Sequence, residues 1–352
     1  HAVVYGAAAI ALSVDLRTTA TVFPTQDALV VIDLPDAETQ LRMPLATVRS
    51  VLPQRQAAQW KEPQKASAEQ VAALKNLAPE NPGLPALFLL WSIGDLHDSA
   101  VSGVTITVSS SLPLGAGLGS SAAFSVSLAA ALLASCHRDA QPEKDLINKW
   151  ALESERLLHG NPSGIDNFTS TFGGAVLLRD GVPRRLPACR PLRLIVTNTK
   201  VPRSTADIVK AVAQRRERHP TIMDSVIASL GAASSHAAMV LTGSDGETTT
   251  AQPGEAEALQ TLEELIPMTH HLLNALGAGH PALDQVVSLG MSCGFPTKLT
   301  GAGGGGCAFS LVPSEATAER VQRFVDDVTK LGFNPYVTDV GGQGVRIEED
   351  RP

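Results

Sequence analysis

Apolar residues recur in short runs near the start of the chain and in longer groups with helical spacing further on. The runs at 2–4, 10–14 and 18–23 are rich in β-branched residues and predict strands, although residues 6–12 would also suit a short helix. Residues 84–96 are apolar enough to predict a buried helix. The chain is therefore expected to begin with strands and to continue into helical structure.

A strand, a loop and a helix are predicted to follow one another in the middle of the chain. Residues 101–108 alternate β-branched with small side chains, which predicts a strand, and a helix is expected to begin near Ser120. Apolar residues at helical spacing predict another helix at 144–158, and residues 307–312 predict a strand. The polar tract 242–253 predicts an exposed loop.

The length of 352 residues corresponds to about two domains of roughly 150 residues each. A basic stretch from Pro183 to Pro202 is marked by prolines and lies between two apolar segments, which favours a domain boundary there. We therefore expect an α+β protein with an N-terminal domain at 1–191 and a C-terminal domain at 192–352.

Composition and charge exclude several classes of protein. With 44% hydrophobic and 18% charged residues, the chain is too apolar to be disordered. Its net charge of −7 provides no positive field that would attract nucleic acid or an anionic membrane, so we expect neither as a partner. The four cysteines lie far apart without a C-x-x-C pair, which argues against a disulfide framework or a structural metal and favours a reducing compartment such as the cytoplasm.

Residues 99–136 contain no charged side chain and are long enough to raise the question of a membrane span. Serines at 109–111, Pro113 and several glycines interrupt this stretch. The helix-like remainder at 122–136 is too short to span a bilayer and contains further serines. We therefore expect no membrane span.

The sequence P-L-G-A-G-L-G-S-S-A-A, at 113–123, lies between a predicted strand and a predicted helix. Its alternate glycines allow a tight turn and close approach to a ligand, and Ser120 and Ser121 stand where a helix cap belongs. A helix start of this kind suits phosphate, although a plain strand-to-helix turn with a serine cap would use the same residues. No Lys follows the glycines as in a Walker A loop, and the spacing does not fit the dinucleotide fingerprint.

Two further segments contain residues suited to chemistry. The glycine run at 299–306 precedes a predicted strand, which rejects a Rossmann loop and favours close approach to a ligand or to another loop. In H-G-N-P-S-G-I-D-N, at 159–167, Pro162 and Gly164 force a turn that would project Asp166 as a base or metal ligand. A helix-ending turn with solvated polar residues is the alternative for this second segment.

Four motifs stand in the order that characterises one enzyme family: 113–123, 159–167, N-T-K-V-P-R-S-T at 198–205 and K-L-T-G-A-G-G-G-G at 298–306. Together they resemble the superfamily of galactokinase, homoserine kinase, mevalonate kinase and phosphomevalonate kinase (GHMP kinases), and their detail is most similar to its mevalonate kinase branch. The resemblance runs nearly end to end. It implies a two-domain GHMP-kinase fold with the phosphate-binding glycine loop in the N-terminal domain and a ferredoxin-like C-terminal domain.

The resemblance also implies ATP-dependent phosphorylation of the 5-hydroxyl of mevalonate with Mg²⁺, in the isoprenoid pathway that leads to sterols. Asp166 corresponds to the family's catalytic base. The residues that correspond to the family's ATP-phosphate loop are Gly115, Gly117, Gly119, Ser120 and Ser121. Ser121 and Glu155 correspond to the Mg²⁺ ligands, which are hard oxygen donors. Residues on the substrate side are His1, Lys200, Arg203 and Thr205, and the third glycine loop consists of Gly301, Ala302, Gly303, Gly304 and Gly305.

Two departures from the family pattern limit these expectations. Only His1 represents the family's N-terminal P-G-K-x-x-L-x-G-E-H, so we expect a catalytic Lys, and any targeting signal, upstream of the printed chain. Phe124 stands where close relatives often have Tyr. The remaining alternatives are another small-molecule kinase of the family, such as a phosphomevalonate or homoserine kinase, and an inactive nucleotide-binding homologue. A homodimer is compatible with the sequence.

Overall fold

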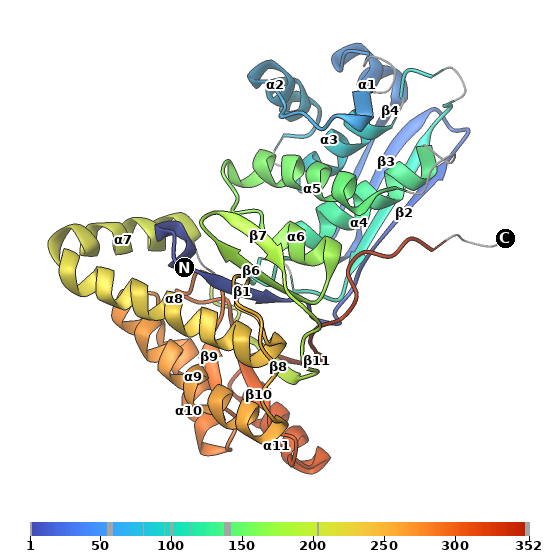
Figure 1. The fold of residues 1–352 in the computed structure, drawn as a ribbon. Coiled ribbons are helices and arrows are strands. Elements are labelled where there is room, and N and C mark those ends of the chain that lie inside the picture. Colours follow the sequence, from blue (N-terminus) through green and yellow to red (C-terminus); the bar gives the residue numbers. More distant parts are fainter. Residues whose placement is uncertain are drawn as a thin grey trace. The chain divides into compact units, whose positions relative to one another are not determined.

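The structure is a computed structural model that describes residues 2–54, 59–79, 81–94, 96–98, 101–113, 115–136, 142–202 and 204–348. It consists of two compact units (Figure 1). Unit 1 contains the described residues of His1–Asp15, Gly115–Leu118 and Gly173–Gln343. Unit 2 contains those of Leu16–Leu114, Gly119–Phe172 and Gly344–Pro352.

The two units interleave along the chain instead of following one another. Residues 173–191 belong to unit 1 together with the C-terminal segments, and the N-terminal segment of the chain belongs to the same unit. A compact unit is defined by contacts in space, whereas a domain predicted from the sequence is a continuous stretch of chain, so the units do not test the predicted boundary. The boundary predicted at residue 191 therefore stays a prediction.

Unit 2 is built on one four-stranded sheet. Its strands are β2 (Thr18–Pro24), β3 (Leu29–Leu34), β4 (Thr39–Pro44) and β5 (Val104–Ser110), in the order β2-β5-β3-β4. Strands β3 and β5 run parallel, whereas β2 pairs with β5 and β4 with β3 in antiparallel fashion. Every second residue of β3 is buried, beginning at Val30, because alternate side chains face the core.

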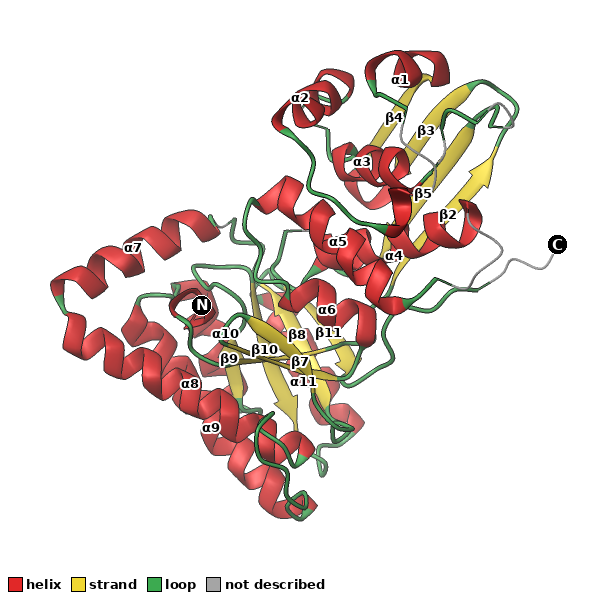
Figure 2. Ribbon diagram, turned by 45° about the horizontal axis from the view of Figure 1, so that its top comes forward, coloured by secondary structure: helices red, strands yellow, loops and turns green. Residues whose placement is uncertain are grey.

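Helices complete the core of unit 2. They are α1 (Leu45–Val51), α2 (Ala68–Leu77), α3 (Leu84–Ile93), α4 (Ser120–Cys136), α5 (Lys144–His159) and α6 (Ile165–Phe172), with short 3₁₀ turns η2 (Pro35–Ala37) and η3 (Gln59–Lys61). Figure 2 shows α3, α4 and α5 against the sheet. The rings of Phe88 and Trp150 meet edge to face at 6.3 Å between centroids, and Trp150 Nε1 donates to the Trp60 carbonyl oxygen at 2.8 Å. This packing fixes α5 against α3.

Unit 1 contains the ferredoxin-like layer that the family resemblance implies. Its antiparallel strands are β8 (Arg193–Asn198), β9 (Thr297–Leu299), β10 (Cys307–Val312) and β11 (Asn334–Asp339), in the order β11-β8-β10-β9. Helices α7 (Thr205–Arg218), α8 (Pro220–Thr242), α9 (Glu255–Leu276) and α10 (Pro281–Ser292) separate β8 from β9, and α11 (Ala318–Lys330) separates β10 from β11. This is the β-α-β-β-α-β succession of ferredoxin-like folds, here with several helices in the first connection.

A second, three-stranded sheet also belongs to unit 1. Strands β1 (Ala9–Leu12), β6 (Ala175–Arg179) and β7 (Val182–Arg185) pair antiparallel in the order β1-β6-β7. Residues far apart in the sequence therefore meet in one sheet, because β1 comes from the first segment of the chain. The predicted α+β class is confirmed.

Most predicted elements are found, and the start of the chain is the main correction. Strand β10 occupies the predicted residues 307–312, and a helix begins at Ser120. Residues 2–4 are not a strand but belong to the 3₁₀ turn η1 (Ala2–Tyr5), which packs Ala2 into the core of unit 1. The short helix considered for 6–12 is also wrong, because Gly6 turns the chain at φ +79° into strand β1.

Helix α8 is, among the described residues, long and apolar enough to cross a membrane. Its side chains Met223, Ile227 and Leu230 are buried in the core of unit 1, whereas Asp224 is exposed. One such helix is weak evidence for a span, because the core helix of a folded domain has the same length and composition. The expected absence of a span stays a prediction.

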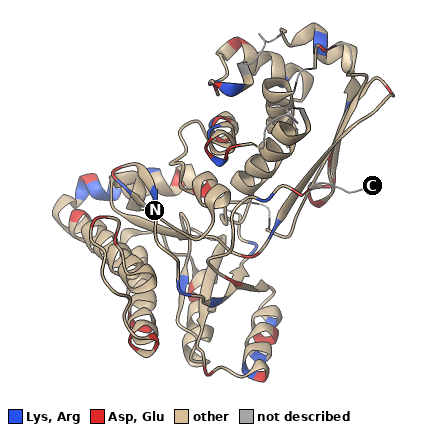
Figure 3. Ribbon diagram, turned by 45° about the vertical axis from the view of Figure 1, so that its right-hand side comes forward, with Lys and Arg blue, Asp and Glu red and all other residues tan. Residues whose placement is uncertain are grey.

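Charges of both signs are interspersed along the described chain (Figure 3). Two arginines of the basic stretch, Arg184 and Arg185, are exposed on β7. Arg193 instead forms an ion pair with Asp339 across neighbouring strands, with Nε and Oδ1 3.1 Å apart. Some arginines of the basic stretch are therefore exposed to solvent, and another is paired with a carboxylate.

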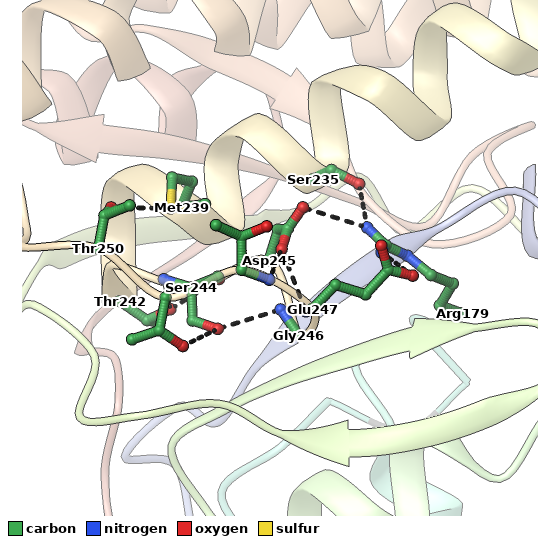
Figure 4. Close-up of polar contacts among 11 residues, drawn as sticks. Arg179, Ser235, Met239, Thr242, Ser244, Asp245, Gly246, Glu247 and Thr250 are labelled. Atoms are coloured by element: carbon green, nitrogen blue, oxygen red, sulfur yellow. Dashed lines mark hydrogen bonds and ion pairs between the residues drawn. The ribbon is translucent and has the colours of Figure 1, made fainter.

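The polar tract 242–253, predicted to be exposed, is anchored at its beginning (Figure 4). Arg179, at the end of β6, donates to Ser235 Oγ on α8 at 2.9 Å and pairs with the carboxylates of Asp245 and Glu247 at 3.7 and 2.7 Å. Ser244 is buried and accepts a hydrogen bond from the Gly246 amide at 3.1 Å. The prediction was wrong for this part of the tract, because one cation ties it to the sheet.

We expect Arg179→Met to lower the free energy of unfolding by about 1 to 3 kcal/mol, because it removes a charged donor shared by several acceptors. Arg193→Met is the matched control, since the side chains of its ion pair are 60% and 65% exposed. It should change stability by less than about 0.5 kcal/mol. Urea unfolding measures both variants. Equal losses would contradict the anchoring role of Arg179.

Candidate active site

The start of helix α4 forms the first part of the site. Gly119, at φ +74°, accepts the first helical hydrogen bond from the Ala123 amide at 2.9 Å, so the helix begins immediately after it. The first-turn amides, including those of Ser120 and Ser121, have no acceptor within the helix. Together with the helix dipole, they make this end attractive to an anion such as phosphate.

Asp166 lies beside this helix start. It stands in the first turn of α6 and is exposed. A Cβ atom placed on Gly119 would lie 3.6 Å from the Asp166 Cβ and 3.7 Å from its carboxyl carbon, so the glycine leaves the carboxylate uncrowded. The neighbouring Asn167 is buried and donates to Asn148 Oδ1 on α5 at 2.6 Å. This bond holds the start of α6 in place.

Glu155 reaches the same region from the end of helix α5. It is only 4% exposed, and its Oε2 accepts a hydrogen bond from Ser121 Oγ at 3.0 Å. Ser125 Oγ lies 3.3 Å from the other carboxylate oxygen. Burial is the main cause that raises the Glu155 pKa above its usual value, and the negative charge of Asp166 adds to the rise.

The donor set suits a small divalent cation. A buried carboxylate, a hydroxyl and a second carboxylate close enough to perturb the first are all hard oxygen ligands. The part of the chain that the structure describes contains no group of three or more His, Cys, Asp or Glu residues suited to a metal. A cation here would therefore take its other ligands from outside the chain, as Mg²⁺ does with the phosphate oxygens of a nucleotide.

The third glycine loop lies in unit 1, docked against neighbouring loops. The Gly304 amide donates to the Ala278 carbonyl oxygen at 2.8 Å, and a Cβ atom on Gly303 would come within 2.0 Å of that same oxygen. A Cβ on Gly305 would lie 2.8 Å from Val201. The glycines therefore allow close approach to other loops, which is one of the two uses that the sequence predicted.

The motif 198–205 meets this glycine loop. Thr199 Oγ1 donates to the Gly306 carbonyl oxygen at 2.7 Å, and the Lys200 amide donates to Asn198 Oδ1 at 2.9 Å. Lys200 is exposed and has φ +58°, a backbone conformation that only a few per cent of non-glycine residues adopt. Thr205 is exposed at the start of α7. The loop thus presents a cation and a hydroxyl to solvent.

The phosphate loop itself divides between the units. Gly115 and Gly117, at φ +67° and +78°, belong to unit 1, where the intervening Ala116 packs against Val196 and Cys307. Gly119, by contrast, belongs to unit 2.

The predicted site residues therefore form two groups. One group in unit 2 consists of Gly119, Ser120, Ser121, Glu155 and Asp166, and one in unit 1 consists of Gly115, Gly117, Lys200, Thr205 and Gly301 to Gly305. His1 and Arg203 lie outside the described residues.

Sequence reasoning missed several polar residues around these groups. Ser125 and Ser154 are fully buried next to Glu155, and His159 Nε2 lies 3.7 Å from Glu155 Oε2. Lys298 places its ammonium 5.1 Å from the centroid of the Phe309 ring, and burial lowers the Lys298 pKa to about 8. Helical spacing could have pointed to Ser125, one turn after Ser121, but nothing in the pattern distinguishes it from a core serine.

Comparison with known proteins identifies the family. The chain matches the family described as GHMP kinases N terminal domain at residues 87–174 and that described as GHMP kinases C terminal at 255–330. The first match contains Ser121, Glu155 and Asp166. The fold and these two matches thus define a GHMP kinase.

Full-length relatives narrow the class. The chain is 38% identical to mevalonate kinase from Homo sapiens, over 99% of this chain and 91% of that protein. It is 32% identical to mevalonate kinase from Arabidopsis thaliana, over 99% of this chain and 95% of that protein. The chain belongs to the mevalonate kinase family.

Solved structures support the fold. The mevalonate kinase of Methanococcus jannaschii superposes with a TM-score of 0.73 at 22% identity, covering 98% of this chain and 94% of that one. The L. major mevalonate kinase in complex with R-mevalonate superposes with a TM-score of 0.70 at 20% identity, covering 98% and 93%.

We expect Gly303→Ala to lower the free energy of unfolding by about 1 to 3 kcal/mol more than Gly332→Ala, because only the first new methyl group collides with backbone. Both glycines have left-handed φ, +83° and +85°, and the Cβ of an alanine at 332 would meet nothing within 4 Å. The difference between the two variants therefore cancels the cost of placing alanine at a positive φ and leaves the cost of the collision. Thermal and urea unfolding compare the variants, and equal losses would show that the third glycine loop is not tightly docked.

Proposed function

We propose that this chain transfers the γ-phosphoryl group of ATP to the 5-hydroxyl of mevalonate, with Mg²⁺ as the cation. The observation that carries the proposal is the meeting of the α4 start, the exposed carboxylate of Asp166 and the buried carboxylate of Glu155 in one unit. Membership of the mevalonate kinase family supports the reaction and the substrate.

Phosphoryl transfer needs positioning and charge stabilisation more than covalent chemistry from the protein. The amides at the start of α4 supply fixed partial positive charges for the phosphate oxygens of ATP. Gly119 lets those oxygens approach, since it carries no side chain next to Asp166. The positive end of α4 therefore orients the nucleotide, and the reaction itself takes place at the neighbouring carboxylate.

Asp166 acts as the general base in this proposal. The 5-oxygen of mevalonate attacks the γ-phosphorus, its proton passes to the Asp166 carboxylate, and the bond from the γ-phosphorus to the β,γ-bridging oxygen breaks to release ADP. The carboxylate is exposed, so an alcohol can reach it. Its backbone is held by the bond between Asn167 and Asn148, which keeps the base still during the transfer.

Ser121 and Glu155 are the residues that would hold Mg²⁺. Bound there, the ion would stabilise the charge that develops on the transferring phosphoryl group. The Ser121 hydroxyl already donates to the Glu155 carboxylate, so both ligands stand in one place before a cation arrives.

Residues of unit 1 serve the substrate and phosphate side of the proposal. Lys200 offers a cation for a carboxylate or a phosphate, and Thr205 offers a hydroxyl at the first turn of α7. The cytoplasmic location and the homodimer stay predictions.

We expect Asp166→Asn to lower kcat by about 10²-fold or more while folding and ATP binding persist, because the amide keeps the shape but cannot accept the proton. Asp145→Asn is the matched control, since Asp145 is an exposed aspartate in the first turn of α5. It should leave kcat unchanged. A coupled ADP-release assay measures both variants, and near-normal kcat for Asp166→Asn would leave Asp166 a purely structural role.

The choice of substrate has its own test. The unaltered chain is assayed for ADP release with mevalonate, phosphomevalonate, homoserine and galactose. We expect kcat/KM to be highest for mevalonate. A preference for one of the other alcohols would change the substrate, and no ADP release with any of them would favour a nucleotide-binding homologue without turnover.

A further inference from the structure

Two buried serines adjoin the proposed cation site, and neither of them is one of its proposed ligands. Ser125 lies on α4 one turn after Ser121, and Ser154 precedes Glu155 on α5. Both have an exposed fraction of 0%. A buried hydroxyl destabilises a core unless it is hydrogen-bonded, so these two groups need partners.

Their partners are each other and the Glu155 carboxylate. Ser125 Oγ lies 3.0 Å from Ser154 Oγ and 3.3 Å from Glu155 Oε1. Each serine hydroxyl has one proton, and an ionised carboxylate only accepts. Ser125 is the donor in both contacts, so its one proton lies between Ser154 Oγ and Glu155 Oε1.

Ser125 acts together with Ser121. Ser121 Oγ donates to Glu155 Oε2 at 3.0 Å, so each carboxylate oxygen receives one hydroxyl donor, and both donors lie on the same face of α4. Two donors on the two oxygens stop the carboxylate from rotating about its bond to the side chain. Bonds to an ionised acceptor are stronger than bonds between neutral groups.

We propose that Ser125 is a positioning residue whose hydroxyl, held between Ser154 and Glu155 as a relay, orients the Glu155 carboxylate for its cation. The inference rests on the proposed function, because it assumes that Glu155 is a ligand. Mg²⁺ demands near-ideal geometry from its ligands, so a carboxylate fixed in advance binds it better than one that must first be ordered. The relay therefore sets metal affinity without touching the metal.

The test measures binding of Mn²⁺, as a spectroscopic substitute for Mg²⁺, to the protein saturated with ADP, by electron paramagnetic resonance. We expect Ser125→Ala to weaken Mn²⁺ binding by about 10-fold, as loss of support behind a metal ligand usually does. Ser127→Ala is the matched control on the same helix, because the Ser127 hydroxyl donates only to the Phe124 carbonyl oxygen, at 3.1 Å. It should bind Mn²⁺ normally.

A second readout separates positioning from general damage. Binding of ADP without metal should be unchanged in Ser125→Ala, since the relay acts on the carboxylate alone, whereas a distorted α4 would weaken both ligands. Circular dichroism confirms folding, and Ser125→Cys, which keeps the size of the side chain but donates more weakly, replaces Ser125→Ala as the test if the latter does not fold.

Glu155→Gln distinguishes the inference from the function on which it rests. If that variant loses Mn²⁺ while Ser125→Ala binds it as tightly as Ser127→Ala does, the relay is overturned and the metal site stands. If Glu155→Gln still binds Mn²⁺ normally, the metal site and the relay fall together.

Discussion

Glu155 imposes the constraint on which the rest of the site depends. A carboxylate that is 4% exposed is unfavourable unless donors surround it, and its pKa is raised because burial outweighs His159 and the two serine hydroxyls, which favour the charged form. Helix α4 must therefore present its serines to α5, and it must begin immediately after Gly119 so that its first-turn amides face the same place. The resulting negative charge beside the positive end of a helix suits a cation that is bound to the phosphate groups of a nucleotide.

The third glycine loop, in unit 1, depends instead on close contact with neighbouring loops. Gly303 and Gly305 approach Ala278 and Val201 more closely than any side chain would allow. Close docking ties the loop to the motif that contains Lys200, whose left-handed backbone persists because the Asn198 side chain holds its amide. Backbone strain concentrated at predicted functional residues is typical of sites where precise placement matters more than stability.

Part of this account could be predicted from the sequence, and the rest depends on contacts in space. The apolar run 307–312 and the start of α4 were predicted because period and cap chemistry are local signals. Asp166 was predicted because a family motif contains it, and Glu155 because the family resemblance assigns it to the Mg²⁺ site. Three features were not predicted, because each depends on contacts between residues far apart in the sequence. They are the 3₁₀ turn at Ala2, the anchor at Arg179 and the relay at Ser125. The interleaving of the two units has the same cause.

The central claim is that Ser121 and Glu155 are the protein's ligands for the catalytic cation. Crystals grown with Mn²⁺ and a non-hydrolysable ATP analogue test it directly, because manganese gives an anomalous signal that locates the ion. The account predicts one anomalous peak within about 2.0 to 2.3 Å of Ser121 Oγ and of a Glu155 carboxylate oxygen, shared with the analogue's phosphate oxygens. A peak held by other side chains, with Glu155 still bonded only to serine hydroxyls, would contradict it.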